Sequence, residues 1–97
     1  MAASGSTVRL RVSEDTTRLI RHSHPKLKRR IKRALSTIIE DPYSGKALTE
    51  ELRGLRSFRM GRIRIIYAIA SKKLIEIVAI GPRKPVYEET YRIISRE

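Results

Sequence analysis

The feature that most constrains this chain is the dipeptide Gly61-Arg62, which lies where strand-like runs at about 55–60 and 62–70 meet. This dipeptide predicts a tight hairpin with glycine at the first central position, as a type II′ turn requires. Such a turn sets the register of the two strands. Because side chains alternate between the faces of a strand, the apolar pairs are expected on one face and two arginines on the other. The predicted pairs are Met60 with Ile63, Arg59 with Arg64, and Phe58 with Ile65.

The arginine pair predicts an anion-binding spot at one edge of the sheet. Like charges directly opposite each other repel, so Arg59 beside Arg64 favours an anion between them, and phosphate is the first candidate. Arg83 follows the third predicted strand, at about 73–80. In an antiparallel meander, the end of the first strand, the start of the second and the end of the third share one edge. The three arginines are therefore expected to converge, with Lys84 and Tyr87 close behind them.

The charge balance narrows the partners. Among 97 residues there are 22 Lys and Arg against 10 Asp and Glu, a net charge of +12, which is typical of a nucleic-acid binder and also fits an acidic protein partner. With no cysteine and two histidines, neither a disulfide framework nor a structural metal is expected. No apolar run has the length of a membrane span or a signal peptide, so the sequence predicts a cytosolic protein.

The whole chain, residues 1–97, is expected to form one small α+β domain. Residues 1–6 are small and polar and are predicted to be disordered. Ser13 is a good N-cap, Pro25 can open a helix, and Pro82 and Pro85 are expected to end the last strand. The predicted elements are a strand at 8–12, helices at 14–20 and 25–41, strands at about 55–60, 62–70 and 73–80, and a short helix at 87–94. This order, β-α-α-β-β-β plus a C-terminal helix, predicts an N-terminal strand and a helical hairpin packed on an antiparallel sheet.

Three stretches carry a family resemblance. They read Asp41-Pro-Tyr-Ser-Gly-Lys-Ala-Leu, Leu52-Arg-Gly-Leu-Arg-Ser-Phe-Arg-Met-Gly-Arg-Ile-Arg-Ile-Ile-Tyr67, and Ile77-Val-Ala-Ile-Gly-Pro-Arg-Lys-Pro-Val-Tyr-Glu88. Together they resemble the RelE branch of the RelE/ParE superfamily of type II toxins. The resemblance implies a toxin that enters the A site of the 70S ribosome and cuts the exposed mRNA codon without a metal or other cofactor. It also implies a cognate antitoxin protein that silences the toxin in a hetero-oligomer.

The resemblance also implies roles for individual residues. Arg64 resembles the family arginine on the scissile phosphate, Arg83 the arginine after the last core strand, and Arg59 falls where a family lysine often stands. The hairpin is shorter than in the best-studied family pattern, so a second loop lysine has no clear counterpart. Lys84 and Arg62 are the candidates to replace it.

The chemistry implied is attack of a ribose 2′-hydroxyl on the neighbouring phosphate, which leaves a 2′,3′-cyclic phosphate and a free 5′-hydroxyl. Arginines suit the developing charge because the guanidinium binds phosphate in a bidentate manner and stays charged. Tyr87 is expected to act as the general base, because surrounding cations favour its phenolate, and Lys84 is the alternative.

Other polar and aromatic residues have simpler interpretations. A basic run on the second helix is expected to contact ribosomal RNA, although a solvated helix face explains it as well. Its residues named for this role, together with Arg62 in the turn, are Lys26, Arg29, Arg30 and Arg33. His22 and His24 are expected in a surface turn, and Tyr67 and Phe58 in the core.

Two other functions fit the same sequence. One is a ParE-like toxin, which inhibits DNA gyrase and has no nuclease chemistry, and the other is a non-catalytic module that binds RNA or the ribosome. Arg83 together with Tyr87 favours the nuclease branch. The antitoxin is expected to supply an acidic segment that adds along the sheet or lies across the helices.

Overall fold

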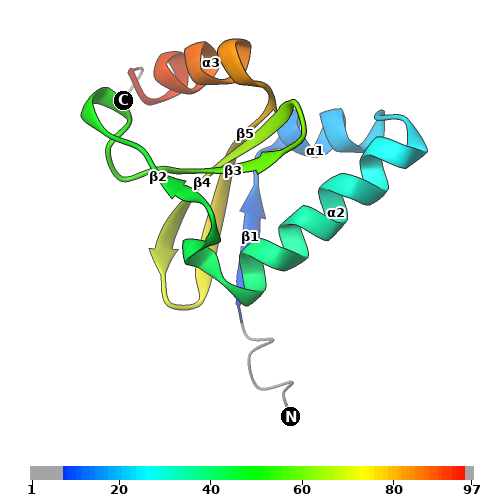
Figure 1. Ribbon diagram of the computed structural model, residues 1–97, viewed down its shortest axis with the longest axis horizontal. Helices are drawn as coiled ribbons and strands as arrows, with labels where there is room; N and C mark the ends of the chain where they lie inside the picture. The colour runs from blue at the N-terminus through cyan, green and yellow to red at the C-terminus, as the bar shows by residue number, and fades with distance from the viewer. Residues whose placement is uncertain (1–7, 96–97) are drawn as a thin grey trace.

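A five-stranded sheet organises the computed structural model, which describes residues 8–95 (Figure 1). The strands are β1 (Arg9–Val12), β2 (Lys46–Ala47), β3 (Arg56–Met60), β4 (Ile63–Ser71) and β5 (Leu74–Pro82). The helices are α1 (Glu14–Arg21), α2 (Pro25–Glu40) and α3 (Arg83–Ser95), with 3-10 turns η2 (Pro42–Ser44) and η3 (Glu50–Leu52). The α+β class and the order of the main elements are confirmed, whereas the disorder predicted for residues 1–6 lies outside the described residues.

The β3–β4 hairpin has the predicted register. Arg59 lies opposite Arg64, and the two flanking apolar pairs also form as expected. Gly61 has a φ of +63°, and Arg62 does not share a positive φ. This is the φ pattern of a type II′ turn, which needs a glycine at its first central position. The turn therefore places both arginines on one face, as the sequence predicts.

The sheet is mixed, because its edge strand β1 runs parallel to β5. The predicted antiparallel meander of β3, β4 and β5 is confirmed, and the direction in which β1 pairs was not predicted. Parallel pairing needs a long connection, and the segment between β1 and β5 contains α1, α2 and the strands β2, β3 and β4. The two-residue β2 was not predicted, since a pairing this short leaves no alternation in the sequence.

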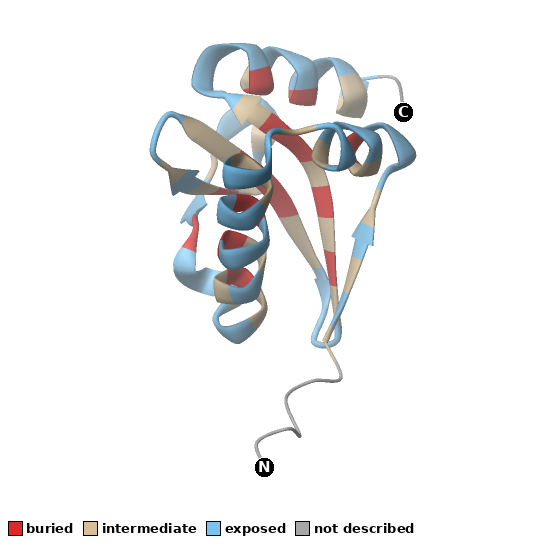
Figure 2. Ribbon diagram, turned by 90° about the vertical axis from the view of Figure 1, so that its right-hand side faces the viewer, coloured by how far each residue is buried: buried red, intermediate tan, exposed pale blue. Residues whose placement is uncertain are grey.

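Two apolar clusters lie on opposite faces of the sheet. The larger one joins Ile31 and Ile38 of α2 to Ile65 and Tyr67 of β4, and the smaller one joins β4 and β5 to Val86 of α3. Figure 2 shows the buried residues along the central strands and on the inner sides of the helices. Tyr67 is fully buried, and Phe58 is half-buried against the larger cluster, so both predictions of core positions are confirmed.

The C-terminal helix begins four residues earlier than predicted, at Arg83 instead of residue 87. Pro82 is the last residue of β5, but Pro85 lies inside the first turn of α3 and does not end the strand. A first-turn proline is compatible with a helix, because its missing N–H has no partner there in any case. Within residues 8–95 the helices are too short and too polar to cross a bilayer.

Candidate anion-binding groove

A groove of about 800 Å³ lies over the sheet face that carries the arginine pair. The start of α3 forms one wall, and the segment from η2 to η3 forms the other. The charged and hydroxyl-bearing residues facing this groove include Lys46, Ser57, Arg59, Arg64, Arg83 and Tyr87. The structure therefore brings together four of the five residues predicted to be catalytic. We call this site the cationic groove.

The arginines of the cationic groove come from three neighbouring segments. Arg59 on β3 faces Arg64 on β4, and Arg64 in turn lies opposite Gly81 on β5. Gly81 has no side chain at this position of β5. Arg83, two residues later, is the first residue of α3. This arrangement leaves the arginine side chains around one open space. The predicted convergence of the three arginines on one site is confirmed.

These cations have no carboxylate partner in the described part of the chain. The ion pairs found there join Arg11 to Glu76 and Arg18 to Asp15, both away from the cationic groove. Guanidinium groups held close together without acids repel one another, and an anion relieves that repulsion. Because arginine forks match the oxygens of phosphate, the groove is suited to a phosphate group.

Tyr87 contacts the floor of the groove. Its phenolic hydroxyl donates a hydrogen bond to Ser57 Oγ at 3.1 Å, and Ser57 is 4% exposed. This contact ties α3 to β3 directly beside the arginine pair. Sequence reasoning missed Ser57, although the hairpin alternation already places it on the same face as Arg59.

The opposite wall is held by a buried tyrosine. The Tyr67 hydroxyl donates to the Pro42 carbonyl at 2.6 Å and accepts a hydrogen bond from the Gly45 amide at 3.0 Å. Arg56 adds donors to the Gly45 and Tyr43 carbonyls. A Cβ at Gly45 would lie 2.6 Å from the Tyr67 hydroxyl, so only glycine fits there without a shift. This anchored turn leads directly into Lys46, a groove lysine that sequence reasoning did not assign to the site.

Two predicted residues lie outside the groove lining. Lys84, the second residue of α3, and Arg62, in the β3–β4 turn, are exposed and are not among the described residues that line the cationic groove. The basic residues Lys26, Arg29, Arg30 and Arg33 are exposed on α2, which packs on the other face of the sheet.

Arg30 links that helix to the turn. A Cβ at Gly61 would lie 2.8 Å from an Nη atom of Arg30, so the guanidinium lies beside the β3–β4 turn that carries Arg62. His22 and His24 are exposed between α1 and α2, as predicted, and His24 Nδ1 accepts a hydrogen bond from the Lys26 amide.

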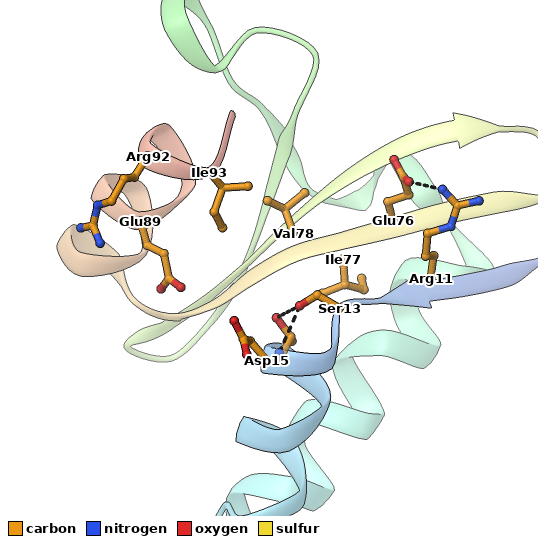
Figure 3. Close-up of a pocket in the computed structure, with 10 residues that line it drawn as sticks. Arg11, Ser13, Asp15, Glu76, Ile77, Val78, Glu89, Arg92 and Ile93 are labelled. Carbon is orange, nitrogen blue, oxygen red and sulfur yellow. Dashed lines mark hydrogen bonds and ion pairs between the residues drawn. The ribbon is translucent and has the colours of Figure 1, made fainter. Parts of the chain in front are cut away.

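A second hollow, of about 480 Å³, lies between α3, β5 and the start of α1 (Figure 3). Arg11 and Glu76 form an ion pair of 2.6 Å at one end, and Asp15 and Glu89 lie toward the other end. Arg92 also lines the hollow, so the positive and negative charges of the lining residues largely offset one another. The excess of positive charge that an anion needs is found in the cationic groove and not in this hollow.

Comparison with known proteins finds similarity to a family of toxins. The family model of the ParE toxin of type II toxin–antitoxin systems, parDE, matches residues 8–87. A comparison with curated protein sequences finds no significant match.

Solved structures share the fold. A RelBE toxin–antitoxin complex from Mycobacterium tuberculosis is 24% identical, with a TM-score of 0.68 over 78% of this chain and 98% of that chain. A double arginine-to-alanine mutant of Escherichia coli RelE in the free state is 17% identical, with a TM-score of 0.71 over 90% and 97% of the two chains. The RelE–RelB complex of Pyrococcus horikoshii is 21% identical, with a TM-score of 0.63 over 80% and 97%. Two of these three similar structures contain an antitoxin.

Proposed function

This chain belongs to the family of ParE toxins of type II toxin–antitoxin systems, within the RelE/ParE superfamily, and on that premise we propose that it is an endoribonuclease. Its substrate is mRNA in the A site of the translating 70S ribosome, and cleavage stops translation. The observation that carries the proposal is the cationic groove, which is lined by Tyr87 together with three arginines that have no acidic partner among the described residues. A toxin that acts only by covering a protein surface needs no such combination of phosphate-binding and proton-transferring groups.

In this mechanism the arginines bind the scissile phosphate. Arg64 and Arg83 hold its oxygens, and Arg59 adds a third positive charge. As O2′ attacks, negative charge builds on the phosphorane, and cations already fixed in place stabilise it without rearrangement. The O2′–P bond forms while the P–O5′ bond breaks.

Proton transfer falls to the other groups of the groove. Tyr87 acts as the phenolate and accepts the proton of the 2′-hydroxyl, since arginine is a poor proton exchanger. The hydrogen bond to Ser57 holds the Tyr87 side chain in place. The leaving 5′-oxygen needs a proton, which a lysine ammonium can donate. Lys46 lines the groove, and Lys84 at the start of α3 is the other candidate for this role. All of these steps use side chains of the protein, so the proposed reaction needs no cofactor.

The proposal includes two macromolecular partners. Exposed basic residues on α2 and in the β3–β4 turn bind ribosomal RNA through its phosphates; they are Lys26, Arg29, Arg30, Arg33 and Arg62. A cognate antitoxin forms a hetero-oligomer with the chain, and the position of β1 at the edge of the sheet in the described residues, together with the net charge, favours an acidic segment of that protein. A protein that acts on ribosomes and binds such an antitoxin works in the cytoplasm.

Inhibition of DNA gyrase is the second candidate function, because the matching family model is that of ParE. A supercoiling assay with purified gyrase separates the two candidates. Inhibition of supercoiling that persists in Arg64→Ala, together with intact mRNA, would favour gyrase as the target.

The deciding experiment for cleavage is primer extension on an mRNA incubated with the protein, with translating ribosomes or with EDTA and no ribosomes. We expect cuts within A-site codons in the ribosome arm only, and none with Arg64→Ala, while that variant still sediments with ribosomes. Arg18→Ala is the matched control, because Arg18 is an exposed arginine on α1 away from the groove. Association without cuts would support a non-catalytic binding module instead.

A further inference from the structure

A row of side chains extends from the cationic groove along α3. Arg83, Tyr87 and Tyr91 are spaced four residues apart, so they lie on the same side of the helix. The first two line the groove. Each step of four residues advances about 6 Å along a helix, which places Tyr91 one step beyond Tyr87, on the side away from Arg83.

Tyr91 is available for a ligand. It is 52% exposed, and among the large hydrophobic side chains of the described residues only Tyr43 is more open to solvent. Together with Tyr87 it lines a shallow hollow whose surface is mostly apolar, and Glu88, Arg92 and Ser95 complete the lining. Because Tyr87 lines both the hollow and the groove, the two sites adjoin each other.

We propose that Tyr91 is a stacking platform for a nucleobase of single-stranded RNA whose backbone lies in the cationic groove. The inference rests on the proposed function and adds a base-binding site to it. The arginines attract the phosphates, and a flat aromatic ring beside a cationic track binds splayed bases of any sequence. In this arrangement Arg83 binds a phosphate and Tyr87 lies at the ribose. Tyr91, the next residue of the row, then binds an adjacent base.

Charge and position favour RNA over a protein segment at this site. The hollow shares Tyr87 with a groove that four cationic side chains line, so a polyanion suits this surface better than an apolar peptide. Tyr43, the most exposed tyrosine at 67%, lacks these features. It is not among the described residues that line the groove, and the Arg56 guanidinium already lies 5.1 Å from its ring centroid.

The test is binding of a 2′-O-methyl RNA trinucleotide that carries 2-aminopurine, which the protein cannot cleave. Stacking quenches the fluorescence of this base, so one titration reports both affinity and stacking. We expect quenching by the unmodified chain and by Tyr91→Phe, about tenfold weaker binding with little quenching for Tyr91→Ala, and no change for Tyr43→Ala. Tyr91→Leu, which keeps apolar bulk but no flat ring, should behave like the alanine variant.

Several outcomes would overturn the stacking site. These are unchanged binding and quenching in Tyr91→Ala, no binding of the trinucleotide by the unmodified chain, or full binding by Tyr91→Leu. A dimer in sedimentation that Tyr91→Ala abolishes would assign the hollow to a second copy of the chain. Failure of the nuclease proposal would give a different result. Quenching that depends on Tyr91, without cuts on ribosomes, would contradict the nuclease proposal and still support the base-binding site.

Discussion

The hydroxyl of Tyr87 donates a hydrogen bond to Ser57 Oγ, at 3.1 Å, and thereby joins the C-terminal helix to the strand that carries Arg59. Ser57 is nearly inaccessible to solvent, whereas the ring of Tyr87 borders the groove. When the phenol loses its proton, the Ser57 hydroxyl can reverse its role and donate to the phenolate. Ser57 is therefore a positioning residue for the proposed general base.

Ser57→Ala should slow cleavage and leave the fold intact. A hydrogen bond contributes about 0.5–1.5 kcal/mol, so we expect a two- to tenfold lower single-turnover rate on ribosomes with little change in apparent KM. Ser57→Thr should keep most of the rate because it retains the hydroxyl. Ser36→Ala, at an exposed position of α2, is the control. A full rate in Ser57→Ala would show that Tyr87 needs no such support.

Arg59→Ala should stabilise the protein while it lowers activity. Removing one of two arginines that face each other in the sheet relieves a repulsion of about 0.2–1 kcal/mol, which urea unfolding can resolve. The same change removes one cation from the proposed phosphate site, so cleavage should fall. Arg9→Ala, on the exposed edge strand, should show neither effect. Lower stability in Arg59→Ala would contradict the repulsion argument.

Inorganic phosphate should raise the melting temperature of the chain. A ligand that binds the folded state stabilises it by RT ln(1 + [L]/Kd), about 2.7 kcal/mol at a hundredfold excess over Kd. The rise should be largely lost in Arg64→Ala and in Arg83→Ala, and retained in Arg18→Ala. Sodium chloride at matched ionic strength is the reference. Equal stabilisation of all variants would assign the effect to general salt exclusion.

Tyr67→Phe should destabilise the groove wall. The change leaves the Gly45 amide and the Pro42 carbonyl without their partner, at a cost of about 1–3 kcal/mol for a buried group. Urea unfolding measures the loss, and Tyr43→Phe is a control at an exposed ring. Cleavage should also decrease, since Lys46 follows this turn. Unchanged stability would mean that water replaces the tyrosine hydroxyl.

Reversing two charges on α2 should weaken ribosome association and its salt dependence. Arg29→Glu with Arg33→Glu changes exposed residues on one helix face, and each lost phosphate contact reduces the slope of log K against log salt by roughly 0.7–0.9. Sedimentation with ribosomes at several salt concentrations measures this slope. Lys72→Glu with Lys73→Glu, in the β4–β5 turn, makes the same change of net charge elsewhere. An equal loss in both double variants would reduce the effect to net charge alone.

The sequence predicts the centre of this site better than its walls. The two-residue turn at Gly61 determines register, and register determines which face Arg59 and Arg64 occupy, so this part follows from local chemistry. The parallel pairing of β1 and the two-residue β2 depend on distant contacts that leave no periodic signal. Lys46 was missed for the same reason, because its place in the groove depends on a turn held by Tyr67, which is 22 residues from Gly45 along the chain.

The start of α3 shows a different limit. Pro85 predicts the end of a strand, yet proline is equally suited to the first turn of a helix, and the packing of Val86 against the sheet favours the helix. The earlier start matters for the site, because it places Arg83 and Tyr87 on one helical row.

The parallel pairing of β1 with β5 also bears on how the protein assembles. Arg11 and its partner Glu76 are 65 residues apart in the chain, whereas β3, β4 and β5 are joined by tight turns. Contacts between distant segments form more slowly than local ones. We therefore expect the arginine-bearing meander to form first and β1 to close the sheet last, so that the edge of β5 is briefly open to a strand from another protein.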